Sequence, residues 1–183
     1  MVHIIKSFPI PSDTLLGRYR EQAVATVHEA SGQRGALDVS IKPIARGMRI
    51  CGRAVTVSCP PGDNLMLIKA ISLSGPGDVI VLNSGRVANA GPFGEVLAIE
   101  CLTKGINGFL TSGSVRDSQA IIALGFSVFA AGVSVRGTAK ASLGTINHAI
   151  CCGDVVINPG DIILGDDDGA VAIPLSEAER VLE

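Results

Sequence analysis

An acidic residue and an arginine–aspartate pair stand at the starts of two consecutive expected helices. Glu95 comes first, and Arg116 and Asp117 follow after twenty intervening residues. The segment between them has the pattern of a helix over 96–104 and of a short buried strand over 109–111. Both groups are therefore expected at the carboxyl ends of neighbouring strands, where open α/β sheets bind their ligands.

These residue types suit a site for an oxoacid. The guanidinium of Arg116 offers a planar fork of donors for a carboxylate or a developing enolate oxygen. Asp117 supplies a hard oxygen ligand, and one carboxylate is enough to hold Mg²⁺ when water and substrate complete its shell. The N–H groups of the turn from Gly94 onward can receive an anion, and Glu95 can order water or move a proton. The plain alternative is that these residues only cap helices.

Length and composition indicate one compact α/β domain over residues 1–183. Apolar residues make up 47% of the chain and aromatic residues only 3%, which suits buried parallel strands of Val, Ile and Leu. A net charge of −2 provides no basic surface for nucleic acid or for a membrane. Because no apolar run is long enough to span a bilayer and no signal peptide is evident, a cytoplasmic protein is expected.

The remaining pattern predicts the elements around this motif. A long helix is expected from the Ser12–Asp13 cap to about Ala30, and Asp63 can cap a second helix. The loop over 83–91 is expected to shape the substrate pocket. This second helix is predicted over 64–72, and another helix, following the one over 96–104, is predicted over 118–124. Strands are predicted over 50–59, 79–82, 127–130, 146–150, 162–164 and 170–173.

Other candidate chemistry is weak. Five cysteines without a CxxC pattern do not form a disulfide framework. Cys59 and Cys101 are expected in the core. The vicinal pair Cys151–Cys152 is redox-sensitive, binds a soft metal or, as we favour, occupies a strand or turn without chemistry. The acidic run 166–168 is favoured as a turn over a cation site. No Walker A loop, dinucleotide-binding glycine motif or nucleophile elbow is present.

Several longer segments resemble the RraA-like family. They are GDNLMLIKAI, GPGDVIVLNSG, PFGEVLA, GSVRDSQAIIALGF, GTAKASLGTIN and NPGDIILGDDDGAVAIP, and the resemblance covers most of the chain, from about 25 to 174. Within the family, they are most similar to the class II 4-hydroxy-4-methyl-2-oxoglutarate / 4-carboxy-4-hydroxy-2-oxoadipate aldolases. The resemblance implies the swivelling β/β/α type of fold.

The most specific shared element is an acid followed after twenty residues by Arg-Asp. In the family, the aspartate corresponding to Asp117 coordinates Mg²⁺ or Mn²⁺, and the arginine corresponding to Arg116 binds the keto and enolate oxygen. The first acid, here Glu95, acts through metal-bound water. The resemblance assigns the pyruvate carboxylate to the backbone amides of Val96 and Leu97.

The implied activity is cleavage of either 4-hydroxy-2-oxo acid to pyruvate plus a second oxoacid, with oxaloacetate decarboxylation as a side activity. Homotrimers or homohexamers are implied as the assembly. A Schiff-base aldolase is not expected, because Lys69, Lys104 and Lys140 have surface patterns. The competing class is a non-catalytic regulator, since some relatives bind ribonuclease E. Tight binding to the nuclease without metal-dependent turnover would distinguish it.

Two features depart from the aldolase pattern. Those aldolases carry aspartate at the first acidic position, whereas Glu95 is one methylene longer, which bears on substrate choice. They also take a carboxylate from the C-terminal helix of a neighbouring subunit, and this sequence ends near the expected start of that helix. Three alternatives stay open: the tail is short by nature, the contribution is missing, or it comes from Glu177, Glu179 or Glu183.

Overall fold

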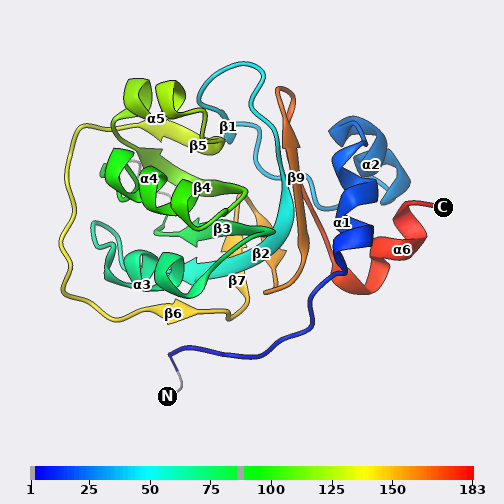
Figure 1. Ribbon diagram of the computed structural model, residues 1–183, viewed down its shortest axis with the longest axis horizontal. Helices are drawn as coiled ribbons and strands as arrows, with labels where there is room; N and C mark the ends of the chain where they lie inside the picture. Colours follow the sequence, from blue (N-terminus) through cyan, green and yellow to red (C-terminus); the bar gives the residue numbers. More distant parts are fainter. Residues whose placement is uncertain (1–2, 86–88) are drawn as a thin grey trace.

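The computed structural model describes residues 3–85 and 89–183, and the described chain is arranged around a curved mixed sheet of eight strands (Figure 1). Strands β2 to β5 are parallel, and β1, β6, β9 and β10 are antiparallel to their neighbours. Because β1 also contacts β10, the sheet is curled and nearly closed. The order is β1 (Lys42–Pro43), β5 (Val128–Val133), β4 (Gly108–Val115), β3 (Asp78–Asn83), β2 (Ile50–Ser58), β9 (Ile162–Asp166) and β10 (Gly169–Ile173), with β6 (Thr145–Ile146) pairing with the end of β2.

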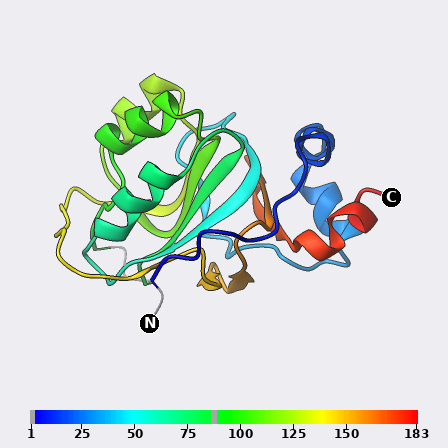
Figure 2. The ribbon, with the colours of Figure 1, turned by 60° about the horizontal axis from the view of Figure 1, so that its bottom comes forward.

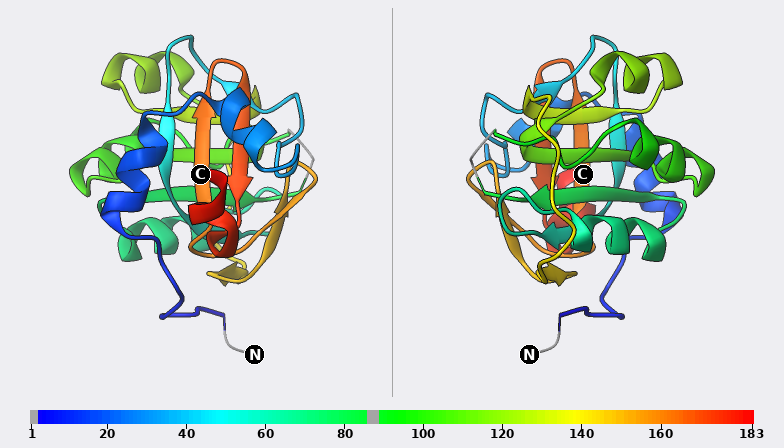
Figure 3. Two further views of the ribbon diagram at one scale, coloured as in Figure 1. Left: turned by 90° about the vertical axis from the view of Figure 1, so that its right-hand side faces the viewer. Right: turned by 90° about the vertical axis from the view of Figure 1, so that its left-hand side faces the viewer.

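Helices cover two separate parts of this sheet (Figures 2 and 3). One group, α3 (Leu65–Leu73), α4 (Glu95–Thr103) and α5 (Ser118–Leu124), lies along the parallel strands. The other group covers β9 and β10 and consists of α1 (Asp13–Arg20), α2 (Val24–Ala30), the 3-10 turn η1 (Leu175–Glu177) and α6 (Ala178–Val181). A separate two-stranded sheet is formed by β7 (Ile150–Cys152) and β8 (Val155–Ile157).

Three apolar clusters hold these layers together. The first fills the space between the parallel strands and their helices, and in it the rings of Phe93 and Phe109 stack with centroids 4.1 Å apart. The second surrounds Phe129 inside the curled sheet. The third lies beneath α1, α2 and α6, where the buried hydroxyl of Tyr19 donates to the carbonyl oxygen of Ala178 at 2.8 Å. Each fully buried large side chain contributes about 1.5–3 kcal/mol.

Helix α4 packs on the sheet through its small residues. Ala98 and Cys101 are completely buried, whereas Val96, Ile99 and Leu102 are 74%, 46% and 42% exposed. The large apolar residues whose spacing predicts this helix therefore lie on its outer face. Small side chains on the inner face allow the helix to lie close to the sheet.

The predicted α/β class is confirmed, but the single long helix from Asp13 to Ala30 is wrong. The chain breaks after Arg20 and resumes as α2 at Val24. The guanidinium of Arg49 lies at this break and donates to the carbonyl oxygen of Gln22 at 2.8 Å. If the helix continued, that carbonyl oxygen would accept the backbone N–H four residues later. At the break it accepts from Arg49 instead, a residue that lies beyond both helices in the sequence.

Two further expectations need correction. The strand expected over 109–111 is longer, because β4 continues to Val115 with an irregular register against β5. The strand expected over 146–150 is divided between β6 and β7, and His148 lies between them. The acidic run is the turn between β9 and β10, as predicted.

The cysteines agree with their expected roles as far as their positions show. Cys59 and Cys101 are buried in the first apolar cluster, and all five cysteines are free. Cys151 and Cys152 are strand residues of β7, with the first exposed and the second buried. Within 3–85 and 89–183, no helix has the length and apolar character needed to cross a membrane.

Candidate functional site

Arg116 and Asp117 connect the end of β4 to the start of α5, as the sequence predicts. The backbone N–H of Arg116 donates to the carbonyl oxygen of Phe93 at 2.9 Å, which holds this connection against the segment before α4. Asp117 has a left-handed backbone conformation, with φ 55° and ψ 35°. Aspartate tolerates this region better than most residues, and such conformations are concentrated at functional sites.

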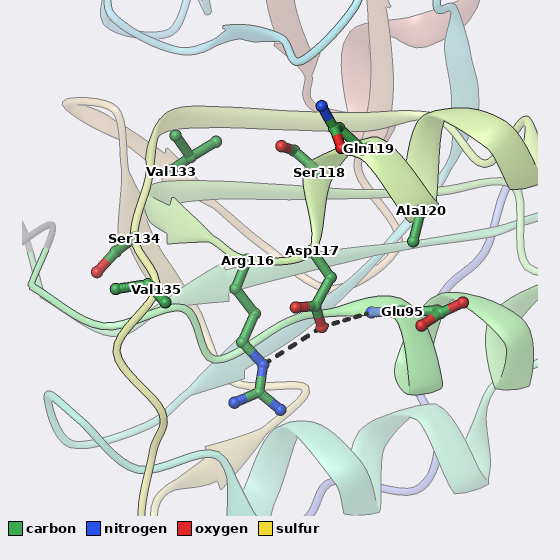
Figure 4. Close-up of a pocket in the computed structure, with 9 residues that line it drawn as sticks. All are labelled: Glu95, Arg116, Asp117, Ser118, Gln119, Ala120, Val133, Ser134 and Val135. Atoms are coloured by element: carbon green, nitrogen blue, oxygen red, sulfur yellow. Dashed lines mark hydrogen bonds and ion pairs between the residues drawn. The ribbon is translucent and has the colours of Figure 1, made fainter.

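The carboxylate of Asp117 meets the backbone of Glu95. Its Oδ2 accepts the N–H of Glu95 at 3.2 Å and lies 3.5 Å from Nε of Arg116 (Figure 4). The side chains of Arg116 and Asp117 are 41% and 44% exposed, so both are open to a ligand. The three residues that the sequence singles out are therefore neighbours in space.

The side chain of Glu95 is the exception within this group. Figure 4 shows its carboxylate pointing away from Arg116 and Asp117, although its backbone nitrogen faces them. Glu95 is an exposed residue, so its carboxylate is free to take other rotamers. A role in proton transfer therefore requires this side chain to turn toward the ligand.

An open cleft of about 540 Å³ lies over these residues. This volume falls within the usual range of small-molecule sites. Glu95, Arg116 and Asp117 supply charged groups, while Val133 and Val135, which are 63% and 94% exposed, supply apolar groups. The cleft can therefore take a small molecule that has both anionic and apolar parts.

Two glycines allow this close arrangement. A Cβ atom on Gly94 would lie 2.5 Å from Oδ2 of Asp117 and 3.0 Å from Nε of Arg116. A Cβ atom on Gly91 would lie 2.7 Å from Cβ of Arg116. Neither position can take a side chain without displacing the pair, so the close approach requires glycine at both positions.

The first turn of α4 has no side-chain cap, because its N-cap residue is Gly94. The N–H of Glu95 is bonded to Asp117, and the N–H of Ala98 donates to the carbonyl oxygen of Gly94 at 3.0 Å. Among the described residues, no acceptor faces the N–H groups of Val96 and Leu97. Unpaired N–H groups at a helix N-terminus attract anions.

Asp63 is more than the cap that the sequence predicts. Its Oδ1 accepts the N–H of Leu65 at 2.8 Å, and its Oδ2 accepts those of Ala141 and Ser142 at 2.8 and 2.9 Å. These N–H groups, first that of Leu65 and then that of Ala141, lower the pKa of Asp63. Asp63 thus fastens the loop that follows Val135 to the start of α3.

Asn64 is a second residue whose contacts the sequence does not reveal. Its Nδ2 donates to the carbonyl oxygen of Pro92 at 2.8 Å in a buried position, and its Oδ1 is buried without a partner among the residues described. Pro92 directly precedes Phe93, which accepts the N–H of Arg116. Asn64 therefore supports the segment that leads into the uncapped turn. In the sequence, Asn64 is distinguished only by its place in the GDNLMLIKAI segment, which resembles the RraA-like family.

The acidic residues near the C-terminus lie far from this cleft. Glu177 accepts from Arg34 at 2.7 Å and from Arg180 at 2.8 Å, and Glu179 pairs with Arg18 at 3.0 Å. Figures 1 and 2 show α6 on the opposite side of the sheet from α4 and α5. The carboxylates of Glu177 in η1 and Glu179 in α6 therefore do not reach the cleft of their own subunit, and a contribution to a neighbouring subunit stays a prediction.

The donors at the cleft fit a magnesium-like cation. Asp117 presents an exposed carboxylate, and Oδ1 of that carboxylate has no partner among the described residues. Mg²⁺ is commonly held by one or two carboxylates, with water and substrate completing the shell. Across 3–85 and 89–183, no three His, Cys, Asp or Glu side chains are grouped to hold a metal ion, so a closed zinc-type site does not fit.

The loop over 83–91, which is expected from the sequence to shape the pocket, includes residues 86–88, and these lie outside the described chain.

Comparison with known proteins identifies relatives over most of the chain. The family model described as RraA-like (Aldolase/RraA) matches residues 23–172. A protein of Halalkalibacterium halodurans with the provisional name 4-hydroxy-4-methyl-2-oxoglutarate aldolase is 39% identical over 147 residues, which are 80% of this chain and 70% of the relative. An uncharacterized protein of Methanocaldococcus jannaschii is 34% identical over 146 residues, or 78% of this chain and 70% of the relative.

Solved structures show the same fold. The crystal structure of Streptomyces coelicolor RraAS2, described as an unusual member of the RNase ES inhibitor RraA protein family, superposes with a TM-score of 0.85 at 25% identity. The match covers 96% of this chain and 92% of that one. An uncharacterized protein of Pseudomonas syringae gives a TM-score of 0.83 at 26% identity, covering 96% and 86%. The fold type implied by the sequence resemblance is confirmed.

Proposed function

The chain belongs to the RraA-like family, and on this premise we propose that it is a divalent-metal-dependent aldolase. The substrates would be 4-hydroxy-4-methyl-2-oxoglutarate or 4-carboxy-4-hydroxy-2-oxoadipate, and the products pyruvate and a second oxoacid. The observation that carries the proposal is the placement of Arg116 and Asp117 beside the uncapped start of α4. The similarity to the H. halodurans protein supports the same class of reaction.

The chain's own groups bind the pyruvate part of the substrate in this proposal. The C1 carboxylate accepts the free N–H groups of Val96 and Leu97, and the 2-oxo group accepts from the guanidinium of Arg116. Both contacts place charged or partly charged donors on anionic oxygens. Mg²⁺ or Mn²⁺, held by Asp117, would supply additional polarisation of the 2-oxo group.

The bond-breaking step begins at the C4 hydroxyl group. The carboxylate of Glu95, after turning toward the cleft, accepts the hydroxyl proton directly or through water. The C4 oxygen forms a carbonyl group, the C3–C4 bond breaks, and its electron pair moves to the enolate of pyruvate. Arg116 stabilises the enolate oxygen more strongly than the initial ketone, which is the condition for catalysis. Protonation at C3 then gives pyruvate.

The same electron sink accounts for the proposed side activity. In oxaloacetate, the C3–C4 bond joins C3 to the departing carboxylate; when it breaks, carbon dioxide leaves and the electron pair stays on the enolate of pyruvate. The exposed apolar residues of α4 suit the homotrimer or homohexamer implied by the family resemblance. Light scattering of the purified protein would measure that assembly.

The test is pyruvate release from 4-hydroxy-4-methyl-2-oxoglutarate and from oxaloacetate, with Mg²⁺ and with EDTA. Arg116→Ala and Asp117→Asn should each lower kcat/KM at least about 100-fold, because each removes a group that acts on the developing charge. Arg18→Ala, which removes an exposed arginine of α1 that pairs with Glu179, should keep full activity. Absence of release by the folded parent protein with Mg²⁺ would reject the aldolase function.

A non-catalytic regulator of a ribonuclease of the E type is the second candidate. The similarity to RraAS2, which is described as a member of an RNase ES inhibitor family, is the observation that favours it. Its measurement is binding of the purified chain to ribonuclease E. Tight binding without metal-dependent pyruvate release would replace the aldolase proposal.

A further inference from the structure

A second cavity, of about 340 Å³, lies at the other end of the sheet, where β2 and β4 begin. Strand β4 runs from this cavity to the candidate site through eight residues, a distance of roughly 26 Å at about 3.3 Å per residue. The two sites are therefore separate. The lining residues are Arg20, Arg49, Ile50, Cys51, Asn107 and Leu164.

Among the described residues that line the cavity, two carry a guanidinium group and none carries a carboxylate. In the described chain, neither Arg20 nor Arg49 forms an ion pair with an acidic side chain. Their charge reaches Cys51: burial raises the pKa of its thiol to about 11, and both arginines oppose this rise. By contrast, Arg18 on the same helix as Arg20 is neutralised by Glu179.

One of the two arginines is already held in place. Nη2 of Arg49 donates to the carbonyl oxygen of Gln22 at 2.8 Å and approaches that of Arg20 at 3.5 Å. Its Nε and Nη1 have no acceptor among the residues described. The floor of the cavity includes Cys51 and Leu164, which are 8% and 1% exposed. A fixed guanidinium beside buried apolar surface binds an anion more strongly than one that moves freely in water.

We propose that this cavity binds a small oxyanion, either a phosphate group or a carboxylate, between Arg20 and Arg49. An oxyanion would accept from the free N–H groups of both guanidinium groups and offset the repulsion between their charges. Asn107, whose Nδ2 donates to the carbonyl oxygen of Cys51 at 2.9 Å, forms the adjoining wall. The proposal does not depend on the aldolase function.

The test is isothermal titration calorimetry with inorganic phosphate and, separately, with acetate. The Arg116→Ala protein in metal-free, low-salt buffer serves as the parent, because it lacks the arginine of the candidate site. Arg20→Ala and Arg49→Ala should each weaken binding on the order of tenfold or more. Arg18→Ala removes the same charge from the same helix but lies outside the cavity, so it should leave binding unchanged.

Arg49 also holds the break between α1 and α2, and Arg20→Ala keeps the test valid if the Arg49 variant does not fold.

Stronger binding of phosphate would identify a phosphate site, and stronger binding of acetate would identify a carboxylate site; either result supports the proposal. It is overturned if the Arg116→Ala parent binds neither anion. Equal weakening by Arg18→Ala and Arg20→Ala would also overturn it, because binding would then reflect only general surface charge.

Discussion

Helices α3 and α4 have nine residues each and cover the same face of the sheet, yet they begin in opposite ways. In α3, the N–H of Leu65 is bonded by Asp63. Burial raises the pKa of the Cys59 thiol to about 11, and the N–H groups of Leu67 and Met66, the next two of the helix, oppose this rise. The chain itself thus bonds the first N–H of α3 and places a thiol near the next two.

In α4, the corresponding turn follows a glycine, and within the described part of the chain the N–H groups of Val96 and Leu97 beside Arg116 have no acceptor. Every helix leaves N–H groups at its start that need partners. The comparison shows that a start satisfied by the chain contributes to stability, whereas a start left open at a cleft is available to a ligand. Changes at α3 should therefore alter stability, and changes at α4 should alter activity.

The largest effect is expected from Gly94→Ala at the start of α4. The new Cβ would occupy space 2.5 Å from Oδ2 of Asp117, and displacement of a catalytic group by about 1 Å can cost about 100-fold in rate. We expect kcat/KM for pyruvate release to fall by about that factor. Gly75→Ala, whose Cβ would meet nothing within 4 Å, is the matched control. Parental activity in Gly94→Ala would show that the close approach is not needed.

Proline substitution at equivalent positions tests the comparison directly. Val96→Pro removes an N–H of α4 in the first turn, where proline is best tolerated, and Val96 is 74% exposed. We expect KM to rise about tenfold, with the free energy of unfolding changed by less than about 1 kcal/mol. Met66→Pro removes the equivalent N–H of α3 and a buried side chain, so it should cost about 2–5 kcal/mol. An unchanged KM in Val96→Pro would remove the amides from the proposed mechanism.

A smaller effect is expected at Asn64, which directly precedes α3 but supports the segment before α4. Asn64→Ala leaves the carbonyl oxygen of Pro92 without its buried donor and should lower the free energy of unfolding by about 1–3 kcal/mol. Urea denaturation measures this loss. Asn64→Asp keeps the shape but removes the donor, so it should lose at least as much. If the aspartate variant is as stable as the parent, the hydrogen bond has no structural role.

The smallest expected effect is the loss of stability when the carboxylate of Asp63 is protonated at acidic pH. Its pKa in the folded protein is below the ordinary value of 3.8 because backbone N–H groups bond the carboxylate. The resulting stabilisation is fully present above the unfolded pKa and is lost as pH falls through the folded pKa. The difference in unfolding free energy between the parent and Asp63→Asn should therefore shrink between pH 6 and pH 3. A difference that stays constant over this range would contradict the assignment.

The sequence alone predicts the elements whose signals are local. The helix over 118–124 is observed with those bounds, because Asp117 and Gly125 mark its two ends. The proximity of Glu95 to the Arg116–Asp117 pair also follows from the order of strands and helices. These features depend on short segments and on the shared direction of parallel strands.

The remaining features depend on contacts between distant segments. Asn64 meets Pro92 across 28 positions, and Asp63 meets Ala141 across 78, and neither contact has a local pattern. The break between α1 and α2 likewise involves Arg49, which lies beyond both helices in sequence. In α4, the large apolar residues face outward and small residues pack against the sheet. An apolar helical pattern usually marks the buried face of a helix, so the sequence pattern alone predicts the wrong face here.

The third apolar cluster has a consequence for the order in which the protein is made. Helices α1 and α2 precede β9, β10 and α6 in the chain and leave the ribosome before them, but their apolar faces pack against these later elements. Tyr19 reaches its partner Ala178 across 159 positions. The two helices must therefore wait with their apolar faces uncovered until these later elements have been synthesised, a period in which a nascent chain depends on chaperones to avoid aggregation.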